Sequence, residues 1–157
     1  MTNVTPLEQL ANISEEEILA AAEQIHLNRL KRQGSITDPA AAGSFFRMRL
    51  AGLEHEEFHV MFLDTRHRII AVEMLSRGTI DGAEVHPREV VKMALKLNAA
   101  AVLVAHNHPS GSPEPSAADR AVTAQLKAAL TLVDVRLLDH LVVVGDTSVS
   151  LAMRGWL

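Results

Sequence analysis

The chain contains no cysteine and no tyrosine, and aromatic residues make up only 3% of its 157 residues. Without cysteine, the protein cannot form disulfides, thiolate metal sites or a cysteine nucleophile. No apolar run approaches the roughly 20 residues that a membrane-spanning helix needs, so we expect no membrane partner. The polar, acidic start MTNVTPLEQLANISEEE lacks the basic and apolar regions of a signal peptide, which favours a cytoplasmic location.

Basic residues are fewer than acidic residues in this chain. Lysine and arginine number 15 against 19 aspartates and glutamates, giving a formal net charge of −4. This excess of acidic residues argues against general electrostatic binding of nucleic acid. A nucleic-acid partner would need a local basic patch. Hydrophobic residues make up 48% of the chain, which predicts one well-packed domain with an aliphatic core.

Two helices are predicted in the first third of the chain. Ser14 to Glu17 form a capping-box pattern that predicts a helix start. Pro39, which follows an aspartate, is typical of a second helix start. We therefore divide the chain into an N-terminal helical segment, residues 1–52, and a catalytic domain, residues 53–157, and we expect the two to pack as one unit.

From residue 58 the hydrophobic pattern changes its period. Alternating apolar residues predict strands, apolar residues at helical spacing predict helices, and a continuous apolar run predicts a buried central strand. The predicted strands cover 58–63, 69–75, 100–105, 135–144 and 148–151, and the predicted helices cover 87–98 and 116–131. Strands alternating with helices predict an α/β fold with a mixed central sheet flanked by helices.

A candidate metal site follows the predicted buried strand. His106 and His108 are two residues apart, so their side chains point to the same side of an extended chain, roughly 6.6 Å apart along it. Asp119 falls in the first turn of the next helix, and the intervening Pro/Gly-rich loop can fold that turn back over the strand end. Two imidazoles and a carboxylate are a common catalytic zinc set. Such zinc brings the pKa of a bound water down to about 7. Ser116 beside them offers a hydroxyl for an oxyanion.

A purely structural interpretation of the same residues stays open. Ser116 followed by Asp119 is also an ordinary helix cap, and Pro-Ser-Gly is ordinary turn chemistry. We expect His140, inside an apolar strand, to be a core residue rather than a ligand. Spacing alone does not choose between a metal site and a capped turn.

A second motif, His55-Glu56-Glu57-Phe58-His59, has the H-E-x-x-H form of a different class of zinc protease. That chemistry needs a helix, because the two histidines must share one face. Here the segment runs into a predicted strand, on which residues four apart lie roughly 13 Å from each other. An H-E-x-x-H protease using His55 and His59 is therefore kept only as an alternative.

The spacing His-x-His, seven residues, Ser, two residues, Asp resembles the JAMM motif of MPN-domain metalloproteases. The segments around it resemble the bacterial RadC family over roughly residues 53–157: GTIDGAEVHPREVV (78–91), AHNHPSGSPEPSAAD (105–119) and LLDHLVVVG (137–145). JAMM proteins usually carry Ser or Thr between the two histidines, whereas Asn107 here fits RadC-type members. Longer RadC proteins carry an N-terminal helix-hairpin-helix region, and this chain resembles the short form without it.

The resemblance implies an MPN/JAB fold of cytidine-deaminase-like architecture. It implies one Zn²⁺ with a bound water, held by His106, His108 and Asp119. In this class the zinc-bound water attacks the amide carbonyl of a peptide or isopeptide-linked protein substrate. The family places a catalytic Glu two residues before an aromatic at the start of a strand, which matches Glu56, and Glu57 is the next choice.

Two other function classes stay open. The name of the RadC family refers to a role in DNA repair. An alternative hypothesis is therefore that the protein is a nucleic-acid-associated accessory protein. Some MPN domains act only as interaction scaffolds, but those typically lose the ligands that this chain retains.

Overall fold

The computed structural model describes residues 12–32, 36, 39–78 and 84–157. The helices and strands in this part of the chain are α2 (Glu15–Arg32), α3 (Pro39–Leu50), β1 (Glu57–Leu63), β2 (Ile69–Arg77), α4 (Pro87–Lys96), β3 (Ala101–Asn107), α5 (Ala117–Thr131), β4 (Arg136–Val144) and β5 (Thr147–Ser150). None of the described helices is long and apolar enough to cross a membrane.

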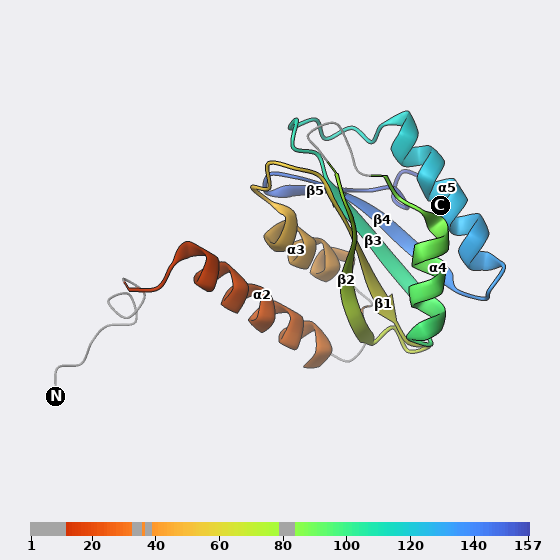
Figure 1. Ribbon diagram of the computed structural model, residues 1–157, viewed down its shortest axis with the longest axis horizontal. Coiled ribbons are helices and arrows are strands. Elements are labelled where there is room, and N and C mark those ends of the chain that lie inside the picture. Colours follow the sequence, from red (N-terminus) through yellow and green to blue (C-terminus); the bar gives the residue numbers. More distant parts are fainter. Residues whose placement is uncertain (1–11, 33–35, 37–38, 79–83) are drawn as a thin grey trace.

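The five strands form one mixed sheet in the order β2-β1-β3-β4-β5. β3 runs parallel to β4, and the other neighbouring pairs are antiparallel. The parallel pair is joined through α5, which crosses one face of the sheet (Figure 1). The predicted α/β class with a mixed central sheet is confirmed, and the architecture is that of an MPN/JAB-like fold.

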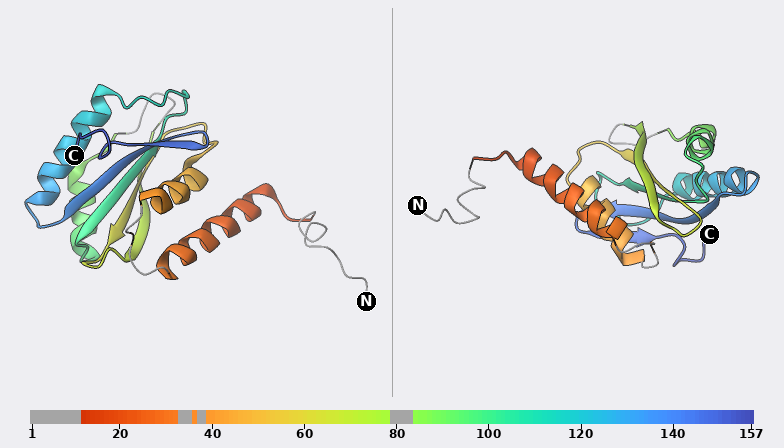
Figure 2. Two further views of the ribbon diagram at one scale, coloured as in Figure 1. Left: turned by 180° about the vertical axis from the view of Figure 1, so that it is seen from behind. Right: turned by 90° about the horizontal axis from the view of Figure 1, so that it is seen from below.

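Helices cover both faces of this sheet. α4 and α5 lie together on one face, and α3 lies on the other, as two views of the molecule agree (Figure 1, Figure 2). α2 lies against α3 and extends away from the sheet. The capping box predicted at its start is present, because Ser14 and Glu17 exchange side-chain to backbone hydrogen bonds of 2.9 and 3.2 Å.

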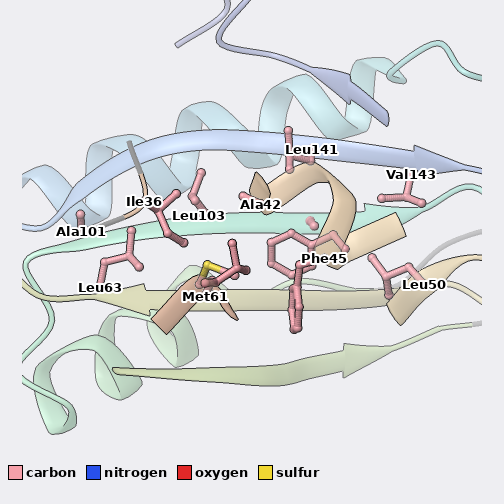
Figure 3. Close-up of a cluster of buried hydrophobic side chains, with 13 residues drawn as sticks. Ile36, Ala42, Phe45, Leu50, Met61, Leu63, Ala101, Leu103, Leu141 and Val143 are labelled. Atoms are coloured by element: carbon pink, nitrogen blue, oxygen red, sulfur yellow. The ribbon is translucent and has the colours of Figure 1, made fainter. Parts of the chain in front are cut away.

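Each face of the sheet has its own hydrophobic core. On the α3 side, Phe45 and Leu50 pack against side chains such as Met61 and Leu103 from the central strands (Figure 3). On the other side, α4 and α5 contribute Val90, Ala94, Leu126 and Leu130. Full burial of such a side chain stabilises the fold by roughly 1.5–3 kcal/mol, so the central strands are the rigid base from which the site is built.

α3 shares the core of the sheet. The side chains of Phe45, Phe46 and Leu50 are at most 1% exposed, and they contact residues of the central strands. α3 therefore packs directly on the sheet. The division into residues 1–52 and 53–157 stays a prediction.

β3 extends two residues past its predicted end, as β2 does. The sequence placed the strand at 100–105 and a loop from residue 106, whereas β3 continues through Asn107. His106 is polar but is paired on both sides, with Phe58 of β1 and Val142 of β4, and Asn107 is still paired with Val143 of β4. The first candidate ligand thus lies in the sheet itself rather than in a loop.

Candidate metal centre

Three side chains from two elements converge at the end of β3. His106 lies in β3, His108 directly follows the strand, and Asp119 lies in the first turn of α5. The two histidine Nε2 atoms are 3.0 Å apart. Asp119 Oδ1 is 3.1 Å from His106 Nε2, and its Oδ2 is 2.9 Å from His108 Nε2. The three predicted ligands therefore present atoms that all lie within 4.8 Å of one another.

The local chain path explains this convergence. Strand alternation puts His106 and His108 on the same face and Asn107 on the opposite one. After His108 the chain reverses through a turn in which the Gly111 N–H donates to the His108 carbonyl at 3.0 Å. Gly111 has a φ of +83°, a conformation that glycine adopts without steric cost. The turn brings the start of α5 back over the strand end.

Ser116 caps α5 and orients Asp119 at the same time. Its hydroxyl accepts a hydrogen bond from the Asp119 N–H at 3.0 Å, and its own N–H donates to Asp119 Oδ2 at 2.8 Å. This reciprocal pair is a capping box. The structural interpretation of these residues and the metal-site interpretation are therefore compatible, because the cap fixes the carboxylate that faces the histidines.

The outer nitrogens of both histidines have partners away from the cluster. His108 Nδ1 donates to the Ser112 carbonyl at 2.9 Å. His106 Nδ1 lies 2.7 Å from His140 Nε2. Because these partners occupy the Nδ1 atoms, the Nε2 atoms are the ones presented to a ligand, and a metal-binding histidine typically makes such an outer hydrogen bond.

Hydrogen bonds within the cluster shift the pKa values of Asp119 and His108 in opposite directions. Burial raises the pKa of the Asp119 carboxyl, but the hydrogen bonds from His106 and His108 outweigh it and hold this pKa well below its usual range. The hydrogen bond to Asp119 raises the pKa of His108, and burial only partly offsets that effect. Asp119 is therefore an ionised carboxylate at neutral pH, which is the form that binds a metal.

This donor set fits a divalent transition metal. Two imidazole nitrogens and one carboxylate face a single point, and the side chains of His106 and Asp119 are 2% and 12% exposed. Such a set leaves a further coordination position open to solvent or substrate. The residues therefore form a potential metal-binding triad at the base of an accessible cavity.

That cavity has a volume of about 830 Å³ and contains the triad together with two other predicted residues, Glu56 and Ser116. Phe58 of β1 and Val85 form apolar parts of its wall. Glu114 also borders the cavity, with its carboxylate paired with Arg154 at 2.9 Å, and none of the described lining residues is lysine or arginine. The cavity thus combines a polar, acidic base with apolar walls.

The two candidate general bases lie at the start of β1 and face opposite sides of the sheet. Glu56 borders the cavity that holds the triad. Glu57 faces the α3 side, where its Oε1 and Oε2 lie 2.8 and 2.7 Å from the Nε2 atoms of His55 and His59. Of the two carboxylates, Glu56 is the one that the fold brings to the triad.

The H-E-x-x-H segment lies in extended chain, and β1 begins at Glu57. Both histidines of the segment pair with the carboxylate of Glu57 rather than with each other. Burial raises the pKa of Glu57, but the hydrogen bonds from His55 and His59 outweigh it and leave this pKa below the usual value. Burial lowers the pKa of His59, which is 3% exposed. This arrangement lacks the helix that an H-E-x-x-H zinc site needs.

Sequence reasoning missed three residues that hold the site. Asn107 accepts a hydrogen bond from the Glu57 N–H at 2.8 Å and donates to the His55 carbonyl at 2.9 Å. Its side chain is therefore hydrogen-bonded to the backbone on both sides of Glu56. His140 and Thr123 are fully buried behind His106. His140 is a core residue as predicted, but its contact with His106 depends on the pairing of β3 with β4, which no local pattern reveals.

Comparison with known proteins agrees with the predicted resemblance. Residues 36–156 match the family described as the RadC-like JAB domain. A UPF0758 protein of Xanthomonas oryzae pv. oryzae (strain PXO99A) is 56% identical over 144 residues, which are 90% of this chain and 64% of that protein. A UPF0758 protein of Vibrio cholerae serotype O1 is 54% identical over 143 residues, which are 91% of this chain and 90% of that protein. The chain thus spans just under two thirds of the Xanthomonas relative. It is a member of the RadC-like JAB domain family.

Proposed function

We propose that this protein is a zinc-dependent hydrolase that cleaves the amide bond of a peptide or an isopeptide-linked protein. The observation that carries the proposal is the meeting of His106, His108 and Asp119 with Glu56 and Ser116 in one cavity. Two imidazoles and one carboxylate are a typical ligand set for catalytic zinc. The chain contains no cysteine, so thiolate-based alternatives do not arise.

In this proposal His106, His108 and Asp119 hold the metal. A zinc ion at such a site supplies Lewis acidity and lowers the pKa of a water molecule into the neutral range. Glu56 takes the proton from the attacking water and delivers it to the leaving amine, as a positioned carboxylate can do. Ser116 already accepts a hydrogen bond from Asp119 N–H through its oxygen, so its hydroxyl hydrogen is the part that donates to the carbonyl oxygen of the substrate.

The charge of the cavity favours an amide substrate over a phosphodiester. Binding of nucleic acid depends on lysine and arginine contacts to phosphates, and the described lining residues include neither. The carboxylates of Glu56 and Asp119 border the cavity instead, whereas that of Glu114 is paired with Arg154 at 2.9 Å. These features argue against nucleic-acid binding at this site. Salt-dependent DNA binding that persists after zinc is removed would support the nucleic-acid-associated alternative.

The test is hydrolysis of quenched fluorescent peptides and of a peptide pair joined through a lysine ε-amine, using zinc-loaded full-length chain. Glu56→Gln removes the proton acceptor and is expected to lower kcat by about 10²–10⁴-fold, the usual contribution of general acid–base catalysis. Glu57→Gln is the matched control, because the same change is made at the next residue on the opposite face of β1. Equal activity of Glu56→Gln and wild type would overturn the proposed mechanism.

A further inference from the structure

We propose that His140 and Thr123 form a buried hydrogen-bond relay that fixes the tautomer of His106 and ties it to the backbone of Asp119, and that this relay raises the metal affinity of the site. The inference rests on the proposed function only in taking His106 and Asp119 as metal ligands. Both relay residues are fully buried, with 0% exposed surface. They come from β4 and α5, two elements that meet only in the folded protein.

The relay consists of three short contacts. His106 Nδ1 lies 2.7 Å from His140 Nε2. His140 Nδ1 lies 2.6 Å from Thr123 Oγ1. Thr123 Oγ1 donates to the main-chain carbonyl of Asp119 at 2.6 Å. The chain of contacts therefore begins at one ligand and ends at the backbone of another.

The threonine hydroxyl sets the direction of this chain. A hydroxyl has one hydrogen, and Thr123 uses it on the Asp119 carbonyl, which can only accept. Thr123 Oγ1 must then accept from His140 Nδ1, so the proton of the neutral His140 ring lies on Nδ1. His140 Nε2 is left with a lone pair and accepts from His106 Nδ1. It follows that the His106 Nε2 lone pair points toward His108 and Asp119, as a ligand requires.

The surroundings keep the relay dry and rigid. The ring of Phe58 packs edge-on against His140, with centroids 5.7 Å apart and an interplanar angle of 82°. No described carboxylate makes a hydrogen bond to either nitrogen of His140, since its two partners are His106 and Thr123. Many metal-binding histidines donate to a carboxylate or a carbonyl. Here a neutral histidine takes that place, and its own Nδ1–H in turn needs an acceptor, which is Thr123 Oγ1.

Thr123→Val tests the relay with little change in shape. Valine cannot accept from His140 Nδ1, so the Nδ1 proton loses its partner in a buried position. The metal-free variant can avoid this cost by moving the His140 proton to Nε2, but that tautomer turns a donor toward His106 and opposes its ligand tautomer. Metal binding must therefore restore the Nδ1–H tautomer with its unpaired proton, and substitutions behind a metal-binding histidine typically reduce affinity by about 10–100-fold.

The experiment is a competition titration of the full chain with zinc alone against a chromophoric chelator. Thr123→Val is expected to bind zinc at least tenfold more weakly than wild type, in line with the usual 10–100-fold effect of such changes, and Thr123→Ser to recover most of the affinity. Thr131→Val is the matched control, because Thr131 lies on the same helix and makes the same hydroxyl contact, to the Lys127 carbonyl at 2.6 Å. Equal affinity of Thr123→Val and Thr131→Val would overturn the proposal.

A spectroscopic measurement tests the direction of the relay without any substrate. Two-bond ¹⁵N–¹H correlation spectra of the zinc-loaded protein report which ring nitrogen of each histidine carries the proton. The relay predicts the Nδ1–H tautomer for His140, and the Nε2–H tautomer would contradict it. Failure of the wild type to bind zinc would instead overturn the proposed function, so the two failures are distinguishable.

Discussion

The side-chain amide of Asn107 brackets the peptide groups on either side of Glu56. Its Oδ1 accepts from the Glu57 N–H at 2.8 Å, and its Nδ2 donates to the His55 carbonyl at 2.9 Å. Asn107 stands between His106 and His108 in the chain, but strand alternation directs its side chain away from them. One 4%-exposed residue thus ties the strand that carries a metal ligand to the segment that carries the proposed general base.

Asn107→Ala is therefore expected to impair catalysis without removing the metal. Loss of both hydrogen bonds lets the backbone at Glu56 move relative to the triad, and a displacement of about 1 Å at a reacting group can cost on the order of 100-fold in rate. We expect kcat to fall by about 10–100-fold while KM and bound zinc change little. Steady-state kinetics and elemental analysis of the same preparation check this. Loss of zinc in proportion to activity would show that Asn107 supports the triad rather than Glu56.

Ser116→Ala is expected to affect both stability and rate. Removal of the N-cap hydroxyl typically costs about 1 kcal/mol in the free energy of unfolding, and loss of an oxyanion donor lowers kcat by about 10²–10³-fold. Urea unfolding and peptide hydrolysis measure the two effects. Ser14→Ala is the matched control, since Ser14 forms the same kind of capping box at the start of α2. If Ser116→Ala lost stability but kept full activity, Ser116 would be a cap and nothing more.

The cluster of Glu57 with His55 and His59 is expected to make stability depend on pH. The pKa of Glu57 is lower in the folded protein than its usual value of 4.5, so its contribution is present above pH 4.5 and is lost as the pH falls through the folded pKa. The pKa of His59 is also lowered, from a usual value of 6.5. Below pH 6.5 the unfolded chain therefore binds a proton that the folded protein does not, and stability falls further.

Urea unfolding between pH 2.5 and pH 7.5 checks this expectation. Wild type should lose stability toward acid, and Glu57→Gln should be less stable than wild type at neutral pH, with a difference that narrows only as the pH falls below 4.5. If the difference in unfolding free energy between the two proteins stays constant or widens in acid, ionised Glu57 does not stabilise the fold.

The candidate site could be predicted from the sequence to the extent that it lies in one contiguous stretch. His106, His108, Ser116 and Asp119 fall within residues 106–119, where strand alternation, a turn and a helix cap suffice to bring them together. The α5 cap at Ser116 was also predicted at the residue where the structure has it. These elements are local, so their patterns are visible without knowing the fold.

The residues that support the site could not be predicted in the same way. Asn107 meets the backbone of residues 55 and 57 because β1 and β3 pair with Phe58 opposite His106, and this register is a property of the whole sheet. His140 reaches His106 only through the parallel pairing of β3 with β4. The predicted end of β3 is too early for a related reason, since pairing with both neighbouring strands keeps the polar His106 extended and pairing with β4 does the same for Asn107.

The most direct test of the account is the zinc content of purified protein after incubation with zinc and removal of the excess. Wild type and the double variant His55→Ala with His59→Ala are expected to hold one zinc per chain, because the second pair lies on the far side of β1 and shares Glu57 rather than a metal. His106→Ala with His108→Ala, and separately Asp119→Ala, are expected to hold none. Zinc lost only from the His55 and His59 variant, or absent from wild type, would contradict the assignment of His106, His108 and Asp119 as the metal centre.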